Sequence, residues 1–139
     1  MTKIYTPELL FYQKLGELFY AVAAADKVVR KAEYDALEKL VEEEWKSKSD
    51  YEDEFGINAA YQIAIVFEWF DYEQIEVNGC FEDFSYYYKN HKDKFSKKRK
   101  KLILKTARKI ANAFAKTNKS ELILITKLEL LFNKKEQLS

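Results

Sequence analysis

Apolar residues recur every three or four positions along most of this chain, which is the spacing of one face of an α-helix. The first such segment runs from Thr6 to Ala25, with Thr6 as a candidate N-cap and Pro7 at the first helical position. A second segment extends from Lys31 to Trp45. Further helices are predicted, in chain order, over residues 57–70, 80–91, 97–116 and 120–135.

No segment shows the sustained alternation of apolar and polar residues that is typical of β-strands. The polar residues 46–56 predict a loop, and residues 71–79 predict a turn region. The segment 57–70 is apolar nearly all round, which predicts a largely buried helix. With only three Gly and one Pro in 139 residues, we expect an all-α fold of six to seven helices in a single domain, 1–139.

The two ends of the chain match each other when they are aligned with an offset of 88 residues. The matched pairs are Val22 with Ile110, Ala23 with Ala111, Ala25 with Ala113, Glu33 with Glu121, Leu37 with Ile125 and Leu40 with Leu128. Each unit is an Ala-containing helix, a break, a glutamate and a second amphipathic helix. We therefore expect a bundle-like domain of two pseudo-repeated helical hairpins, with central aromatic-rich helices completing the core.

The stretch "LFYAVAAADKVVRKAEYDALEKLV", residues 18–41, resembles the signature of the TerB-like tellurite-resistance proteins, which are related to the amino-terminal domain of a DnaJ-like membrane-associated chaperone. That signature is an Ala-rich helix, an Asp-Gly turn, a Glu seven residues after the Asp, and a Leu-rich helix. The stretch "IANAFAKTNKSELILITKLELL", residues 110–131, is similar to the second half of the same pattern. This chain has Lys27 where the family usually has glycine, and Phe114 opposite Asp26.

The resemblance implies an all-α fold with a pseudo-repeat and an association with bacterial tellurite and stress response. It also implies a binding or scaffold module rather than an enzyme, whose acidic residues engage a divalent metal. Carried onto this sequence, the metal-binding acids are Asp26 and Glu33, with Glu121 as the second-repeat equivalent of Glu33.

The same acids also have purely structural interpretations. With Asn118 as N-cap, Glu121 occupies the third helical position and completes a capping box, and Glu33 stands at the matching position behind Arg30. Asp26 either shapes the break by bonding to a nearby amide, or joins Glu33 in binding a cation or a partner's Lys or Arg. Two carboxylates fall short of the six to eight oxygens of a tight Ca²⁺ site.

Charge is segregated along the chain. Residues 33–83 hold sixteen acids against three lysines, a net charge of −13, and residues 89–119 hold thirteen cations against one aspartate, a net charge of +12. Either the two blocks neutralise each other, or a basic patch attracts an anionic partner. The candidate patch is Lys97, Lys98, Arg99, Lys100 and Lys101. The alternative function is therefore an adaptor that binds nucleic acid or lipid headgroups through Lys97–Lys109.

Candidate chemistry elsewhere is sparse. His91 and Cys80 are the only residues of their types, so the sequence offers neither a zinc cluster nor a disulfide. No run of about 18 apolar residues predicts a transmembrane helix. We expect a non-enzymatic cytoplasmic protein with a protein partner, no certain cofactor, and peripheral membrane contact favoured over nucleic acid. Most aromatic residues should lie in the core, with at least one tyrosine of residues 86–88 exposed.

Overall fold

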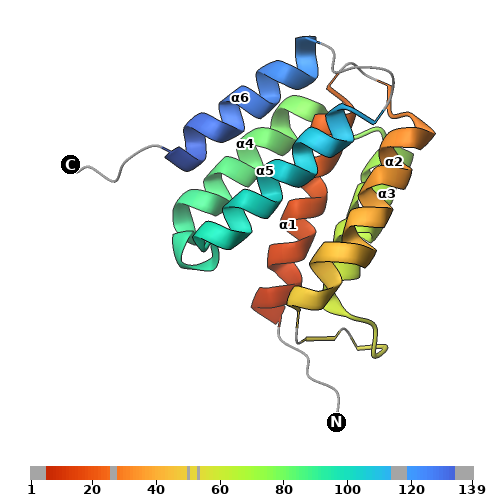
Figure 1. The fold of residues 1–139 in the computed structure, drawn as a ribbon, viewed down its shortest axis with the longest axis vertical. Helices are drawn as coiled ribbons and strands as arrows, with labels where there is room; N and C mark the ends of the chain where they lie inside the picture. Colours follow the sequence, from red (N-terminus) through yellow and green to blue (C-terminus); the bar gives the residue numbers. More distant parts are fainter. Residues whose placement is uncertain (1–5, 26–27, 50, 53, 114–118, 134–139) are drawn as a thin grey trace, which may run out of the picture.

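A computed structural model describes residues 6–25, 28–49, 51–52, 54–113 and 119–133. Across these residues the chain is helical and forms no strand beyond an isolated antiparallel bridge between Glu52 and Asn58, which confirms the predicted all-α class. The six α-helices are α1 (Thr6–Ala23), α2 (Lys31–Leu40), α3 (Gln62–Glu73), α4 (Val77–Asn90), α5 (Lys97–Ala111) and α6 (Lys119–Asn133) (Figure 1). Within the described part, none of them combines the length and apolar content needed to span a bilayer.

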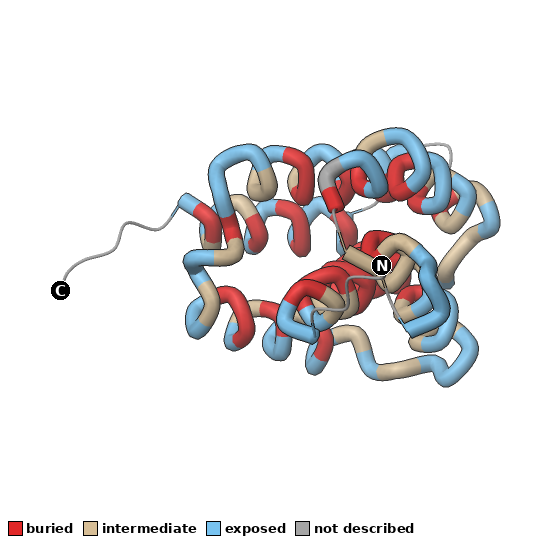
Figure 2. Tube along the Cα trace, turned by 90° about the horizontal axis from the view of Figure 1, so that it is seen from below, coloured by how far each residue is buried: buried red, intermediate tan, exposed pale blue. Residues whose placement is uncertain are grey.

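Helix α1 is the centre of the bundle. It packs against α3, α4, α5 and α6, and Figure 1 shows it running between α4 and α5 on one side and α2 and α3 on the other. Buried positions cover nearly its whole circumference, whereas the outer helices alternate buried and exposed turns (Figure 2). Gly16 lets α3 approach closely, because a Cβ atom there would lie 2.5 Å from the carbonyl oxygen of Ile63.

The predicted helix over residues 31–45 is present but changes pitch halfway. Helix α2 gives way at Val41 to a π-helical turn, η1 (Val41–Trp45), followed by a 3₁₀ turn, η2 (Lys46–Lys48). At the end of η1 the buried Trp45 indole donates a hydrogen bond to Thr106 Oγ1 on α5, at 3.0 Å. A π-helical turn adds a residue to the turn, so it shifts which side of the helix faces the core.

The middle helices begin and end at other residues than the pattern predicts. A 3₁₀ turn, η3 (Ala59–Tyr61), precedes α3, and α3 ends where Gln74 adopts a left-handed conformation with φ of 54°. Helix α4 follows from Val77, so the turn region predicted over residues 71–79 contracts to residues 74–76. A 3₁₀ turn, η4 (Lys92–Lys94), then leads to α5, whose N-cap is Ser96: its hydroxyl oxygen accepts a hydrogen bond from the Arg99 amide at 3.2 Å.

The two predicted repeat units have the same burial pattern. Five of the matched pairs are buried in both units, namely Val22 and Ile110, Ala23 and Ala111, Glu33 and Glu121, Leu37 and Ile125, and Leu40 and Leu128. Helix α2 of the first unit packs against α5 of the second, while α6 packs against both α5 and α1. The units are therefore packed into one another and share a core.

Replacing Gly16 by alanine should destabilise the protein by roughly 1–3 kcal/mol, because the added methyl group collides with the α3 backbone and overpacks the core. Gly79 provides the matched control, since it also lies in a helix but has no atom within 4 Å of the place that an added methyl group would occupy. Gly79→Ala should leave the protein unchanged or stabilise it by up to about 1 kcal/mol. Urea unfolding of both variants measures the difference, and equal free energies of unfolding would contradict the close α1–α3 approach.

Candidate functional site

Glu33 lies in the first turn of α2 with only 1% of its surface exposed. Its Oε1 atom accepts a hydrogen bond from the Arg30 amide at 2.9 Å, and the Arg30 guanidinium lies 4.0 Å from the same oxygen. Arg30 occupies the N-cap position, as predicted, so the interpretation of Glu33 as a helix-capping residue is confirmed. Asp26, its predicted partner in a metal site, lies outside the described residues.

Glu121, the repeat equivalent of Glu33, lies in the first turn of α6 and is also 1% exposed. The two carboxyl groups meet inside the protein. Burial, together with a hydrogen bond to Glu121, raises the pKa of Glu33 from its ordinary 4.5 to about 8. The buried Glu33 Oε2 has no hydrogen-bond donor among the described residues. At neutral pH the Glu33 carboxyl is therefore protonated, as expected for a buried carboxyl beside a second one.

This pair does not by itself make a metal site. Within the described ranges, no group of three or more His, Cys, Asp or Glu side chains is arranged to hold a metal ion. The Arg30 guanidinium beside Glu33 also disfavours a second cation at the same oxygen. The metal site predicted at Asp26 and Glu33 thus depends on Asp26, and it stays a prediction. The capping role predicted for Asn118 likewise falls outside the described residues.

A second titratable cluster joins α1 to α4 and has no counterpart in the sequence analysis. Lys14 Nζ lies 2.7 Å from Asp83 Oδ2 and 3.5 Å from Glu17 Oε1. Burial, reinforced by the neighbouring Asp83, raises the pKa of Glu17 to about 7, while the hydrogen bond from Lys14 lowers the pKa of Asp83. Cys80 lies in the same region, and burial raises the pKa of its thiol to about 12, so it stays protonated and unreactive.

The basic segment divides into inward and outward cations. Arg99 turns inward: its guanidinium lies 3.0 Å from Glu8 and 4.1 Å from the centre of the Phe11 ring. Lys100 lies over the rings of Tyr88 and Phe132. Arg99 is therefore a packing residue, which corrects its place in the predicted anionic-partner patch.

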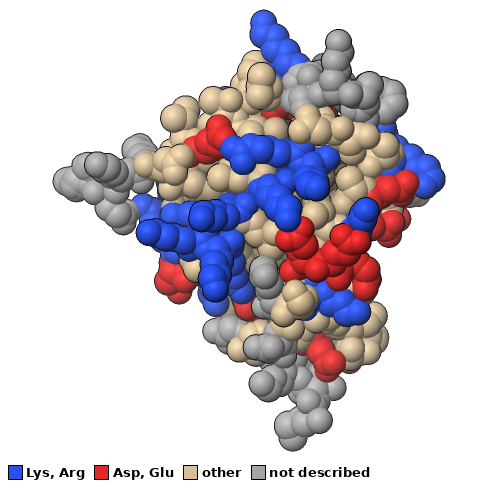
Figure 3. Space-filling view, in the orientation of Figure 1, with Lys and Arg blue, Asp and Glu red and all other residues tan. Residues whose placement is uncertain are grey.

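The remaining cations of that patch face outward. Lys97, Lys98 and Lys101 are exposed and form no ion pair within the described part of the chain. Figure 3 shows a cationic surface beside an acidic one. Between the acidic and basic blocks, Lys105 and Glu44 form an ion pair at 2.6 Å. The acidic block therefore neutralises only part of the positive charge of the basic segment.

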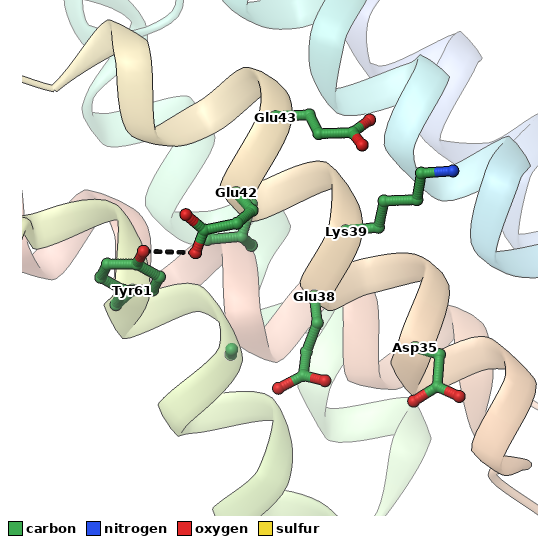
Figure 4. A pocket seen from close by; sticks show the side chains of 8 residues that line it. Asp35, Glu38, Lys39, Glu42, Glu43 and Tyr61 are labelled. Carbon is green, nitrogen blue, oxygen red and sulfur yellow. Dashed lines mark hydrogen bonds between the residues drawn. The ribbon is translucent and has the colours of Figure 1, made fainter.

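The acidic block borders a groove of about 510 Å³ between α2 and the start of α3. Its lining comprises Asp35, Glu38, Lys39, Val41, Glu42, Glu43, Tyr61 and Ala64. Figure 4 shows Glu42 and Tyr61 facing each other across it, where the Tyr61 hydroxyl donates a hydrogen bond to Glu42. Farther along, burial and the carboxylates of Glu38 on α2 and Glu68 on α3 raise the pKa of Tyr34 to about 12. Acidic side chains of α2 and α3 thus lie close together around Tyr34.

Helix α3 is only half buried, contrary to the prediction of a largely buried helix. Ile63 and Phe67 face the core, but Ile65, Trp69 and Tyr72 are 48%, 55% and 83% exposed. We call these three residues the α3 ridge. Their spacing of four and three residues places them on one side of the helix. Tyr86 on α4 is also exposed whereas Tyr87 and Tyr88 are buried, which confirms the prediction for residues 86–88.

No family model, curated protein or solved structure matches this chain. The TerB-like resemblance therefore stays a prediction.

The protonated Glu33 carboxyl predicts an unusual pH dependence of stability. The native state keeps this proton up to about pH 8, whereas an unfolded glutamate loses it near its ordinary pKa of 4.5. The free energy of unfolding should therefore fall as pH rises from about 5 to about 8, by at most about 1.4 kcal/mol per pH unit for one proton. Glu33→Gln, whose amide can donate permanently to Glu121, should flatten this slope.

Glu17 contributes in the same direction over a lower range, because its pKa is also raised, to about 7. Glu17→Gln should accordingly remove a separate part of the slope, and Glu73→Gln, at an exposed acid of α3, should remove none. Urea denaturation at pH 5, 6, 7, 8 and 9 separates the three variants. A slope in Glu33→Gln as steep as in the unchanged protein would rule out a protonated Glu33 in the native state.

Proposed function

We propose that this protein is a non-catalytic helical binding module that engages another protein through the α3 ridge. We further propose that it is a TerB-like cytoplasmic protein of the bacterial tellurite and stress response. The sequence signature over residues 18–41 and its second copy support the family assignment, and the matching burial of the two units agrees with it.

The α3 ridge is the observation that carries the binding function. The helix buries Ile63 and Phe67 on one side while its other side presents an isoleucine, a tryptophan and a tyrosine to solvent. Large aromatic side chains clustered on a surface are typical of interaction sites, where Trp and Tyr contribute disproportionately to affinity. By contrast, the closed carboxyl pair of Glu33 and Glu121 offers no access to a substrate.

A photoreactive benzoylphenylalanine in place of Trp69 should cross-link the protein to its partner in living cells. The same residue in place of Tyr86, which is also an exposed aromatic position, should give little or no adduct because α4 lies outside the ridge. Mass spectrometry of the purified adducts identifies the partner and the attached segment. Equal labelling from the two positions, or none from position 69, would argue against binding through α3.

The outward cations of α5 favour a second candidate, the adaptor for an anionic partner. Lys97, Lys98 and Lys101 project from the first turns of α5 without acidic partners in the described residues. A cation close to an anionic lipid surface contributes about 1 kcal/mol, and contacts with phosphates weaken steeply with salt.

If this candidate is right, the protein should bind at low salt to one of two probes, phosphatidylserine vesicles or a single-stranded RNA. It should dissociate from that probe as the salt concentration is raised. Lys98→Glu should weaken binding by roughly 10- to 30-fold, since it replaces an attraction by a repulsion. Lys39→Glu, an equivalent reversal on the acidic helix α2, should have a smaller effect. Absence of binding to either probe at low salt would eliminate the adaptor.

A further inference from the structure

A second apolar ridge lies on α6. Ile123 and Leu130 are 48% and 67% exposed, and Leu122 beside them is also exposed. We call Leu122, Ile123 and Leu130 the α6 ridge. Because Leu124, Ile125, Leu128 and Phe132 fill the buried side, this helix, like α3, is apolar on two opposite faces. A single core explains only one of those faces, so the other is available for contact with a second surface.

The charges beside the two ridges are opposite in sign. The members of the α3 ridge follow one another at intervals of four and three residues, and α6 places Lys127 between its ridge members Ile123 and Leu130 at the same intervals. The α3 ridge is accompanied by Glu68, and the forty residues from Ser49 to Tyr88 include ten acids and no Lys or Arg.

The charges beside the α6 ridge are positive. Lys119 and Lys127 are exposed, while the acids of α6 are taken up internally: Glu121 is buried and Glu129 is paired with Arg108. Lys127 lies between Ile123 and Leu130 at the border of the α6 ridge, where its charge is opposite to that of Glu68 beside the α3 ridge.

We infer that the α3 ridge of one copy of this protein packs against the α6 ridge of a second copy. This inference rests on the proposed function and names the partner of the α3 ridge. Apolar side chains would cover one another at the centre of the contact, with Glu68 and Lys127 in complementary positions at its edge. The basic helix α5 is a poorer occupant, because its apolar side chains Leu102, Ile103 and Ile110 are already buried in its own core.

The position of the ridges sets the symmetry of the assembly. Helices α3 and α6 lie on different sides of α1 (Figure 1), so the two ridges of one molecule do not cover each other. A contact between unlike surfaces is heterologous and joins copies head to tail. Such an assembly suits a scaffold, since each added copy leaves one ridge of each kind open at the ends.

Sedimentation velocity on the purified full chain tests the contact directly. The wild-type protein should form oligomers that grow with concentration, and Trp69→Ser and Leu130→Ser should each weaken association by roughly 30-fold or more, as expected for central interface residues. Tyr86→Ser removes an exposed aromatic residue outside both ridges and should associate like the wild type. All three positions are on the surface, and thermal unfolding verifies that each variant is folded.

Mixing the two ridge variants separates a heterologous contact from a symmetric one. Trp69→Ser keeps an intact α6 ridge and Leu130→Ser keeps an intact α3 ridge. An equimolar mixture of the two monomeric variants should therefore form a discrete heterodimer that cannot grow further. If like ridges paired with like, the mixture would yield only separate homodimers, and the inference would be wrong.

Two further outcomes would overturn the inference. One is a wild-type protein that stays monomeric at every concentration at which it remains dissolved, and the other is self-association that Trp69→Ser leaves intact. The proposed function fails on different grounds. A monomeric protein that cross-links to a different protein from position 69 in cells would still be a binding module, whereas loss of all cross-linking at that position would remove the function itself.

Discussion

The burial of α1 on nearly all sides is the constraint on which the rest of the fold depends. A helix that contacts four others cannot shift without disturbing all of them, so its side chains set the spacing of the bundle. The tightest point is Gly16, where α3 approaches the backbone of α1. Because α3 is held so closely on its inner side, its outer side is presented rigidly, and a preorganised apolar surface loses little entropy on binding.

Much of the fold could be predicted from sequence, because helical periodicity depends on spacing alone. The helix boundaries are harder to predict, because the π-helical turn at Val41 and the left-handed Gln74 result from packing that leaves no local sequence motif. The exposed side of α3 escapes prediction for a related reason. When a helix is apolar nearly all round, its sequence does not reveal which face meets the core, so the pattern alone places Trp69 in the interior.

The candidate site shows the same division between local and long-range information. The offset of 88 residues identifies Glu33 and Glu121 as equivalent, but equivalence does not imply contact. They meet because α2 and α6 start close together in the folded chain, which places two helix N-termini beside a shared pair of carboxyl groups. Lys14 and Asp83 lie 69 residues apart in sequence and belong to no matched pair of the two repeat units, so only the structure reveals their contact.

The two tryptophans of this chain occupy opposite environments, which gives the protein a pair of built-in optical probes. Trp45 is buried and its indole is hydrogen-bonded to Thr106, whereas Trp69 stands in solvent on the outer side of α3. Their emission therefore has two components: a blue-shifted one that reports on the core, and a red-shifted one that iodide can quench. In one unlabelled sample, the first component thus reports whether the core is folded, and the second reports whether a partner covers Trp69.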